Sequence, residues 1–223
     1  VVVLNKSDLA DPKQTGLWAA KYNEQGLRAI KVESKTGKGL PALYQAIREE
    51  LKEQISGWER KGMTGRPVRV MVLGIPNVGK SSIINRMLIG GGAGKAEVRD
   101  KPGVTRQNRW FTVGKGFELL DTPGVLWPKF EDPIVGERLA FTGAVKDEIL
   151  DVEGLAGRLL EVIAELYPQS LEARYKVKLP TEPLAGHELL ELVGRKRGML
   201  VSGGEVDTER AAITVLDEFR GGK

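Results

Sequence analysis

The 223-residue sequence contains no cysteine. This absence excludes disulfide bonds and thiolate metal sites and fits a reducing compartment, so we expect a cytoplasmic location. The sequence also lacks any apolar run near the roughly 20 residues that a membrane-spanning helix needs. The apolar run at residues 68–73 is short and is interrupted by Arg69. We therefore expect no membrane segment and no membrane partner.

The start of the chain lacks an initiator methionine and a charged-then-apolar secretion signal. Residues 1–4 are Val-Val-Val-Leu, which is typical of a buried strand. A parallel strand that begins at the first residue has no incoming connection. We therefore expect a fragment whose preceding segment is missing.

Neither sign of charge dominates strongly. The formal net charge is +4, a mild excess that favours polyanionic partners but is equally typical of solvated faces. Hydrophobic residues make up 41% and charged residues 29%, so the chain can bury a core. Its length allows one domain of about 150 residues and a second, smaller one.

The first part of the chain alternates strand and helix patterns. Residues 1–4 and 29–32 are expected strands, and between them Asp11-Pro12 supplies an N-cap and a favourable first helical residue. Residues 40–55 carry apolar side chains at helical spacing, so we expect one amphipathic helix there. This alternation indicates an α/β fold.

The next segment repeats that alternation after a break. Residues 56–66 are polar and contain three glycines, so we expect a surface linker. A strand is expected at 68–73, a helix at 81–89 and a hairpin with strands at 109–113 and 117–120.

After about residue 132 helical patterns replace strand patterns. We therefore expect an α/β domain at residues 1–131 and a small all-α domain at residues 132–223.

Residues 74–81, GIPNVGKS, match the phosphate-loop pattern GxxxxGK[ST] between an apolar strand and a helix. Glycine lets such a loop wrap closely, so that main-chain N–H groups and the helix N-terminus face a phosphate. Lys80 would reach the β- and γ-phosphates, and the Ser81 hydroxyl would bind Mg²⁺. The expected phosphate contacts are Asn77, Val78, Gly79, Lys80, Ser81 and Ser82.

A second phosphate motif, Asp-Thr-Pro-Gly at residues 121–124, follows the expected strand at 117–120. Asp121 would hold Mg²⁺ through water, and the Gly124 N–H would meet the γ-phosphate. Thr105, a hydroxyl in the loop between the two motifs, is the candidate second Mg²⁺ ligand. We take Lys80, Thr105 and Gly124 as the candidate catalytic residues.

Residues 5–8, NKSD, lie at the end of the first expected strand. The Asp8 carboxylate can accept two hydrogen bonds from guanine N1–H and the exocyclic amine, a donor pair that adenine lacks. The Lys6 stem can pack over the ring, and Asn5 can tie this loop to the phosphate loop. The expected base contacts are Asn5, Lys6, Ser7 and Asp8, with Ser34 and Lys35 at guanine O6. An ATP-dependent kinase is therefore disfavoured.

These motifs, with the base motif before the phosphate motif, resemble those of the circularly permuted GTPases of the YlqF type, the ribosome biogenesis GTPase A family. The resemblance covers nearly the whole chain. It implies a P-loop GTPase with a doubly wound, mostly parallel sheet, in which residues 56–66 rejoin the permuted halves. It further implies GTP as substrate, GDP as product and Mg²⁺, with a large ribosomal subunit precursor and ribosomal RNA as partners. We expect a monomer.

Two positions depart from common GTPase patterns. Family members usually carry serine where this chain has Glu33, which affects the side-chain part of the O6 contact. Val125 stands where many GTPases have the glutamine that orients water, so intrinsic turnover should be slow. The family's proposed catalytic histidine belongs to the missing N-terminal segment, and we interpret His187, the single histidine, as a structural or surface residue.

Several alternatives stay open at this point. Asn77 resembles an asparagine that coordinates activating potassium in some GTPases, but it can equally serve loop geometry. Arg195, Lys196 and Arg197 suit RNA phosphates, or complement a helix dipole. The leading hypothesis is a GTPase that assembles the large ribosomal subunit. The alternatives are a GTP-dependent RNA-binding switch with little turnover, and a GTPase of transfer RNA modification or of a membrane transporter.

Overall fold

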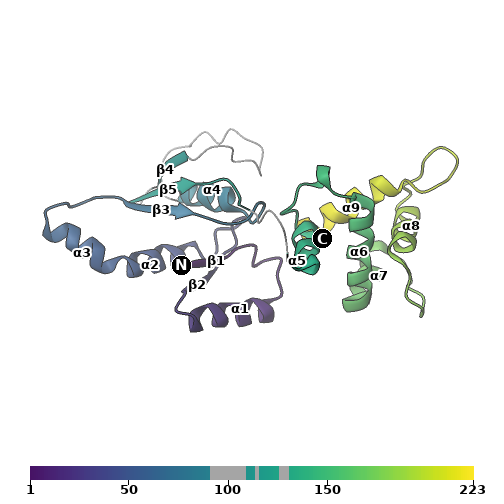
Figure 1. Cartoon of the computed structure of the whole chain (residues 1–223), viewed down its shortest axis with the longest axis horizontal. Helices are drawn as coiled ribbons and strands as arrows, with labels where there is room; N and C mark the ends of the chain where they lie inside the picture. Colours follow the sequence, from purple (N-terminus) through teal and green to yellow (C-terminus); the bar gives the residue numbers. More distant parts are fainter. Residues whose placement is uncertain (91–108, 114–115, 126–130) are drawn as a thin grey trace. The chain divides into compact units, whose positions relative to one another are not determined.

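The computed structural model describes residues 1–90, 109–113, 116–125 and 131–223 (Figure 1). The chain forms two compact units, Val1–Leu126 and Trp127–Lys223. The domain limits expected at residues 131 and 132 stay a prediction, because compactness alone does not show that either part folds by itself.

The first unit alternates strands and helices in the order that the sequence patterns predict. Its elements are β1 (Val2–Leu4), α1 (Pro12–Glu24), β2 (Ala29–Lys31), α2 (Leu40–Glu50), α3 (Lys52–Arg60), β3 (Val68–Val72), α4 (Lys80–Gly90), β4 (Arg109–Val113) and β5 (Phe117–Asp121). The Asp11 side chain caps α1 by accepting from the Gln14 N–H at 2.7 Å, as expected.

The strands of this unit are mostly parallel. β1 pairs with β2 in parallel, and β3 pairs with β5 in parallel, while β4 joins β5 as the expected antiparallel hairpin. The described strands form a two-stranded sheet and a three-stranded sheet of order β3-β5-β4. Parallel pairing brings the loops after β1 and β2 to one edge, and those after β3 and β5 to another.

Both sheets share one core with α2 and α4. Leu43 and Ile47 of α2 lie one turn apart on the same face and are buried, as are Ile84 and Met87 of α4. They pack with Leu119 at the centre of β5, which is fully buried. Full burial of such a side chain contributes about 1.5–3 kcal/mol, so this core anchors the loops at the strand ends.

The prediction of one helix over residues 40–55 is wrong. The helix breaks at Leu51 (φ −104°, ψ 10°), and α3 continues to Arg60, so the first part of the expected linker is helical. Ile55 and Trp58 are three residues apart and both pack against the core. Their packing outweighs the low helix propensity of Gly57, which favours a loop.

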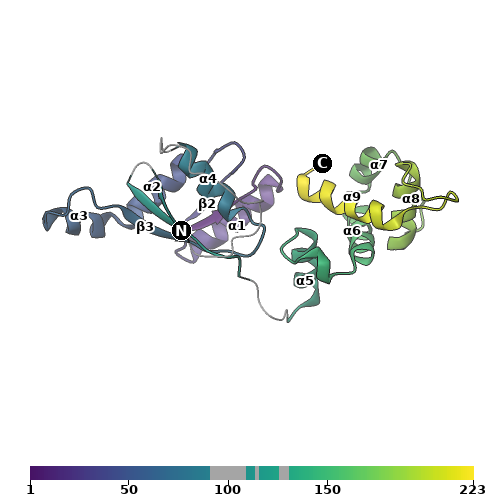
Figure 2. The same ribbon diagram turned by 90° about the horizontal axis from the view of Figure 1, so that it is seen from above.

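The second unit is helical. Its elements are α5 (Pro133–Phe141), the short 3₁₀ helix η1 (Asp147–Ile149), α6 (Val152–Leu166), α7 (Pro168–Tyr175), α8 (Gly186–Lys196) and α9 (Thr208–Gly221). α6 contacts α7, α8 and α9, and its Leu159 and Leu160 lie in the common core (Figure 2). Within residues 131–223 the only strand-like pairing is an isolated bridge between Leu200 and Val206.

Arg220 ties α9 to α5 and η1. Its guanidinium donates to the carbonyl oxygens of Ala140 (3.0 Å) and Phe141 (3.1 Å) and to both Asp147 carboxylate oxygens (2.7 and 2.8 Å). The Arg220 hydrogen bonds lower the pKa of the Asp147 carboxyl. The start of the unit is therefore closed against its last helix.

Replacing Gly186 by alanine should destabilise the helical unit by about 2 kcal/mol, because α6 and α8 meet at two glycines. A Cβ at Gly186 would lie 2.6 Å from the carbonyl carbon of Gly157. Urea unfolding followed by circular dichroism measures the loss. Gly221→Ala is the matched control: no atom lies within 4 Å of its Cβ position, so its stability should change by less than about 1 kcal/mol. Equal midpoints for the two variants would contradict the packing.

Candidate nucleotide-binding site

The NKSD loop follows β1 directly and is fixed on the segment after β2. Ser7 donates to the Val32 carbonyl oxygen from its N–H (3.3 Å) and its hydroxyl (3.2 Å). Lys6 has a positive φ of 55°, and its carbonyl oxygen accepts from the Leu9 N–H at 2.9 Å. The loop is thus a closed turn that leaves Asp8 exposed at its tip.

The phosphate loop connects β3 to α4, as the motif requires. Asn77 (φ 59°) and Gly79 (φ 91°) both take left-handed conformations, which asparagine and glycine tolerate. Lys80 opens α4, is buried, and donates from Nζ to the Ile75 carbonyl oxygen at 3.0 Å. Its ammonium is therefore folded over the loop, where main-chain N–H groups can surround a phosphate. Ser81 and Ser82 follow in the first turn of α4.

Asn5 joins the base loop to the phosphate loop, as predicted from the sequence. Its Nδ2 donates to the Val78 carbonyl oxygen at 2.7 Å, and its Oδ1 accepts from the Ser34 N–H at 3.2 Å. A Cβ on Gly79 would lie 2.3 Å from Asn5 Nδ2, so glycine is required for this approach. One amide therefore connects the three loops after β1, β2 and β3.

The segment after β2 is a turn organised by Glu33. The Glu33 N–H donates to the Lys38 carbonyl oxygen (3.0 Å), and the Glu33 carbonyl oxygen accepts from the Gly37 N–H (2.8 Å). Its carboxylate accepts from Lys38 Nζ (2.9 Å) and the Thr36 hydroxyl (3.0 Å), which lowers the pKa of Glu33. Glu33 therefore closes the turn rather than facing a base.

Ser34 and Lys35 follow Glu33 in this turn. Because the Ser34 N–H donates to Asn5, the Lys35 N–H is the better candidate for guanine O6. Both residues stay in the predicted contact set.

The Asp-Thr-Pro-Gly segment packs on the phosphate loop. The buried Thr122 donates from its hydroxyl to the Val72 carbonyl oxygen at 2.7 Å, and the Val125 N–H donates to the Gly74 carbonyl oxygen at 3.2 Å. A Cβ on Gly124 would lie 2.7 Å from Pro76 Cα. Gly124 is thus brought beside the phosphate loop, as its predicted γ-phosphate contact requires.

The residues expected to bind Mg²⁺ fit that ion by their chemistry. Ser81 is in the first turn of α4, and the Asp121 backbone pairs with Val72 two residues before the phosphate loop. Hydroxyl and carboxylate oxygens are ligands that Mg²⁺ accepts beside phosphate oxygens. No group of three or more His, Asp or Glu residues able to hold a metal occurs in the described part of the chain. Thr105 lies outside the described residues.

The remaining candidates are placed as follows. Val125 is 69% exposed, and an aliphatic side chain cannot position water by hydrogen bonding. The left-handed conformation of Asn77 gives it a role in loop geometry, and potassium binding stays a prediction. His187 is exposed in the first turn of α8, in the helical unit.

None of the helices in the described residues is long and apolar enough to cross a membrane.

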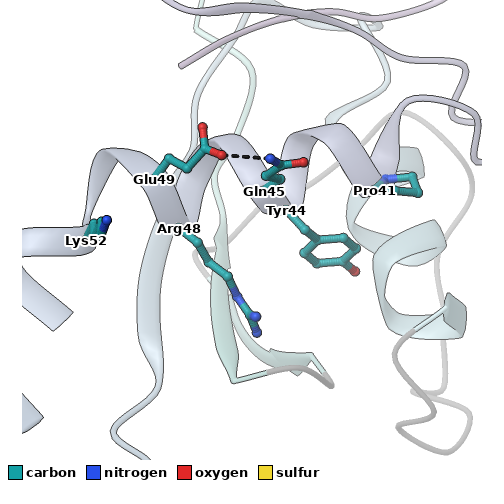
Figure 3. Close-up of a pocket in the computed structure, with 6 residues that line it drawn as sticks. All are labelled: Pro41, Tyr44, Gln45, Arg48, Glu49 and Lys52. Atoms are coloured by element: carbon teal, nitrogen blue, oxygen red, sulfur yellow. Dashed lines mark hydrogen bonds between the residues drawn. The ribbon is translucent and has the colours of Figure 1, made fainter. Parts of the chain in front are cut away.

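A separate open pocket of about 560 Å³ lies along α2 (Figure 3). Gln45 donates to Glu49, one turn along the same helix, at 2.7 Å, and the Tyr44 hydroxyl donates to the Met87 carbonyl oxygen at 3.3 Å. The lining residues are Pro41, Tyr44, Gln45, Arg48, Glu49 and Lys52. None of them belongs to a nucleotide motif, so the candidate site is the loop junction and not this pocket.

The basic residues at the end of α8 differ in their surroundings. Arg197 pairs with Glu218 at 2.6 Å and lies 5.5 Å from the ring centroid of Tyr175, so it is part of the helical packing. Arg195 and Lys196 are exposed in the last turn. Arg197 is exposed as well, so its ion pair and its contact with the Tyr175 ring are what distinguish it from the other two.

Comparison with known proteins agrees with this arrangement. Residues 69–173 match the family described as 50S ribosome-binding GTPase. Ribosome biogenesis GTPase A of Bacillus cereus is 43% identical, over all of this chain and 74% of the relative. The protein of the same name from Thermotoga maritima is 31% identical over all of this chain and 72% of its own length.

Two solved structures are similar over nearly the whole chain. A GDP-bound structure of YlqF has a TM-score of 0.63 and 28% identity, covering 99% of this chain and 78% of the other. A GNP-bound structure of YlqF from T. maritima has a TM-score of 0.61 and 26% identity, covering 100% and 77%.

Proposed function

Because this chain belongs to the ribosome biogenesis GTPase A family and is a GTPase, we propose that it acts on precursors of the large ribosomal subunit. In this role it contacts ribosomal RNA and uses GTP hydrolysis to time its release or a maturation step. In this proposal the protein acts in the cytoplasm and as a monomer.

The observation that carries the nucleotide part is the junction made by Asn5. Its amide holds the NKSD loop, the Ser34 turn and the phosphate loop together through two hydrogen bonds. Guanine and phosphate are then bound by loops whose separation is set before the nucleotide arrives. Such preorganisation reduces the cost of ordering on binding.

In this proposal each loop has one task. Asp8 accepts from guanine, and Lys80 and the main-chain N–H groups of the phosphate loop hold the β- and γ-phosphates. Ser81 and Asp121 hold Mg²⁺, which neutralises phosphate charge when bound. Gly124 N–H contacts the γ-phosphate, so the segment after it responds to the nucleotide state.

Turnover depends on a group that Val125 does not supply. With an exposed aliphatic side chain at that position, intrinsic hydrolysis should be slow, and the ribosomal particle or potassium at Asn77 stimulates it. The same observation favours a second candidate, a GTP-dependent RNA-binding switch with little turnover. The two differ in whether a particle raises the rate.

The ribosomal contact is assigned to the helical unit on charge. Arg195 and Lys196 present two exposed cations at the end of α8, where they can neutralise RNA phosphates. The helix dipole also favours basic residues in the last turn of α8, but this interaction does not require both side chains to be exposed.

GTP turnover measured in potassium and in sodium buffer, with and without large ribosomal subunits, tests the proposal. We expect large subunits to raise turnover at least about tenfold and potassium to raise it further. No stimulation by large subunits in either salt would leave the switch as the function.

Cosedimentation with large subunits tests the contact. A variant with Arg195→Glu and Lys196→Glu should lose most of its binding to large subunits at about 150 mM salt. The variant lacks two cations that would contact RNA phosphates, and the new carboxylates repel those phosphates. The matched control reverses the adjacent pair Arg60 and Lys61, exposed at the end of α3. Equal binding by both variants would remove the α8 residues from the interface.

A further inference from the structure

Arg86 connects α4 to the turn that follows β2. Its Nη2 donates to the Thr36 carbonyl oxygen, and a Cβ on Gly37 would lie 2.8 Å from Arg86 Nε. Gly37 has a φ of 88°, so glycine both permits the turn and leaves room for the guanidinium. The arginine therefore packs directly on the turn.

The turn it contacts is internally closed. Glu33 bonds to Lys38 and Thr36 through its carboxylate and to Lys38 and Gly37 through its main chain. These bonds keep the shape of the turn of residues 33–38, whose ends continue into β2 and, through Gly39, into α2.

Two side chains from other parts of the fold bond to it: Asn5 from the base loop and Arg86 from the helix that follows the phosphate loop. Asn5, which also bonds to Val78, accepts from the Ser34 N–H at one end of the turn. Arg86 donates to Thr36 at the other end, from the helix that begins with Lys80. The main-chain N–H of Lys35 lies between the two anchored residues.

We propose that Arg86 is a positioning residue for guanine recognition: it holds the turn of residues 33–38 so that its main-chain donor meets guanine O6. The inference rests on the proposed nucleotide site. Without Arg86 the turn keeps its Asn5 contact and its connections to β2 and α2, but its tip at Thr36 loses the bond to α4 and can shift. The donor to O6 is then misplaced, while the contacts of Asp8 with N1–H and the exocyclic amine remain.

The test compares three nucleotides by competition titration. GDP and inosine diphosphate carry O6, whereas 6-thio-GDP replaces it with sulfur, a weak acceptor. Arg86→Met, which keeps the apolar stem, should weaken GDP and inosine diphosphate about five- to tenfold and 6-thio-GDP much less. Arg86→Lys should restore part of the loss, since an ammonium can still donate to a carbonyl.

The outcomes separate this inference from the site on which it rests. If the wild-type protein does not bind GDP, the nucleotide site itself fails. If it binds GDP but Arg86→Met binds all three nucleotides as wild type does, or weakens all three equally, the positioning role is overturned. Arg60→Met is the control, because Arg60 is exposed on α3 and should leave all three affinities unchanged.

A second variant reaches the same contact from the other side. Gly37→Ala places a methyl group against Arg86 Nε, so it should weaken GDP binding in the wild-type background and less in the Arg86→Met background. Fully additive losses in the double variant would contradict a shared contact.

Discussion

Replacing Asp8 by asparagine is expected to weaken GTP binding about a hundredfold or more and to create affinity for xanthosine triphosphate. The carboxylate is exposed at the tip of a turn fixed by Ser7 and Lys6, so it is presented to a base without rearrangement. The asparagine oxygen can still accept from guanine N1–H, but its N–H would face the exocyclic amine, where two donors oppose each other. Xanthine has a carbonyl oxygen in place of the exocyclic amine and can accept from that N–H.

Titration with fluorescent derivatives of GTP and of xanthosine triphosphate measures the change in base specificity. Asp11→Asn is the matched control, made three residues along the chain. Asp11 caps α1 through the Gln14 N–H, and asparagine caps about as well as aspartate, so affinity for GTP should stay within about twofold. If Asp8→Asn kept the affinity of wild type for GTP, Asp8 would not be in the base site.

Replacing Lys80 by methionine is expected to lower GTP turnover by about a hundred- to a thousandfold, with GTP binding also weakened. Methionine keeps most of the buried stem but removes the ammonium that lies over the phosphate loop, at 3.0 Å from the Ile75 carbonyl oxygen. The lost positive charge of the Lys80 ammonium is the one that would stabilise the negative charge developing on the γ-phosphate during hydrolysis.

Single-turnover assays at saturating GTP separate the effect on hydrolysis from that on binding. Lys61→Met, at an exposed lysine after α3, is the control and should hydrolyse GTP at the wild-type rate. The free energy of unfolding of Lys80→Met should change by about 1 kcal/mol or less, so that the loss cannot be ascribed to misfolding. Turnover retained in a folded Lys80→Met protein would contradict the phosphate-site assignment.

Two parts of the fold could not be predicted from the sequence patterns, for the same reason. Local propensity favours a loop at Gly57, but Trp58 packs on the core beside Ile55, and tertiary contact makes the segment helical. The contact of Arg86 with Thr36 joins residues 50 positions apart in the chain, and no spacing rule links them. Both depend on which surfaces meet after folding.

The sequence alone determined the motifs and their order. Residues 74–81 and 5–8 are local patterns whose chemistry follows from residue type and from the strands that precede them. Residue type and spacing were therefore enough to predict a phosphate site and a guanine site. The α/β class and the helical second part followed from periodicity, which is also local.

Only the tertiary structure decided how the motifs act together. Asn5 reaches Val78 across 73 positions, Thr122 reaches Val72 across 50, and Gly124 lies against Pro76. The sequence suggested the first of these contacts but did not specify the other two. The physical reason is that the last two contacts depend on parallel pairing of β3 with β5, which brings the loops after these strands to one edge. The first joins the two sheets, which pack on one common core.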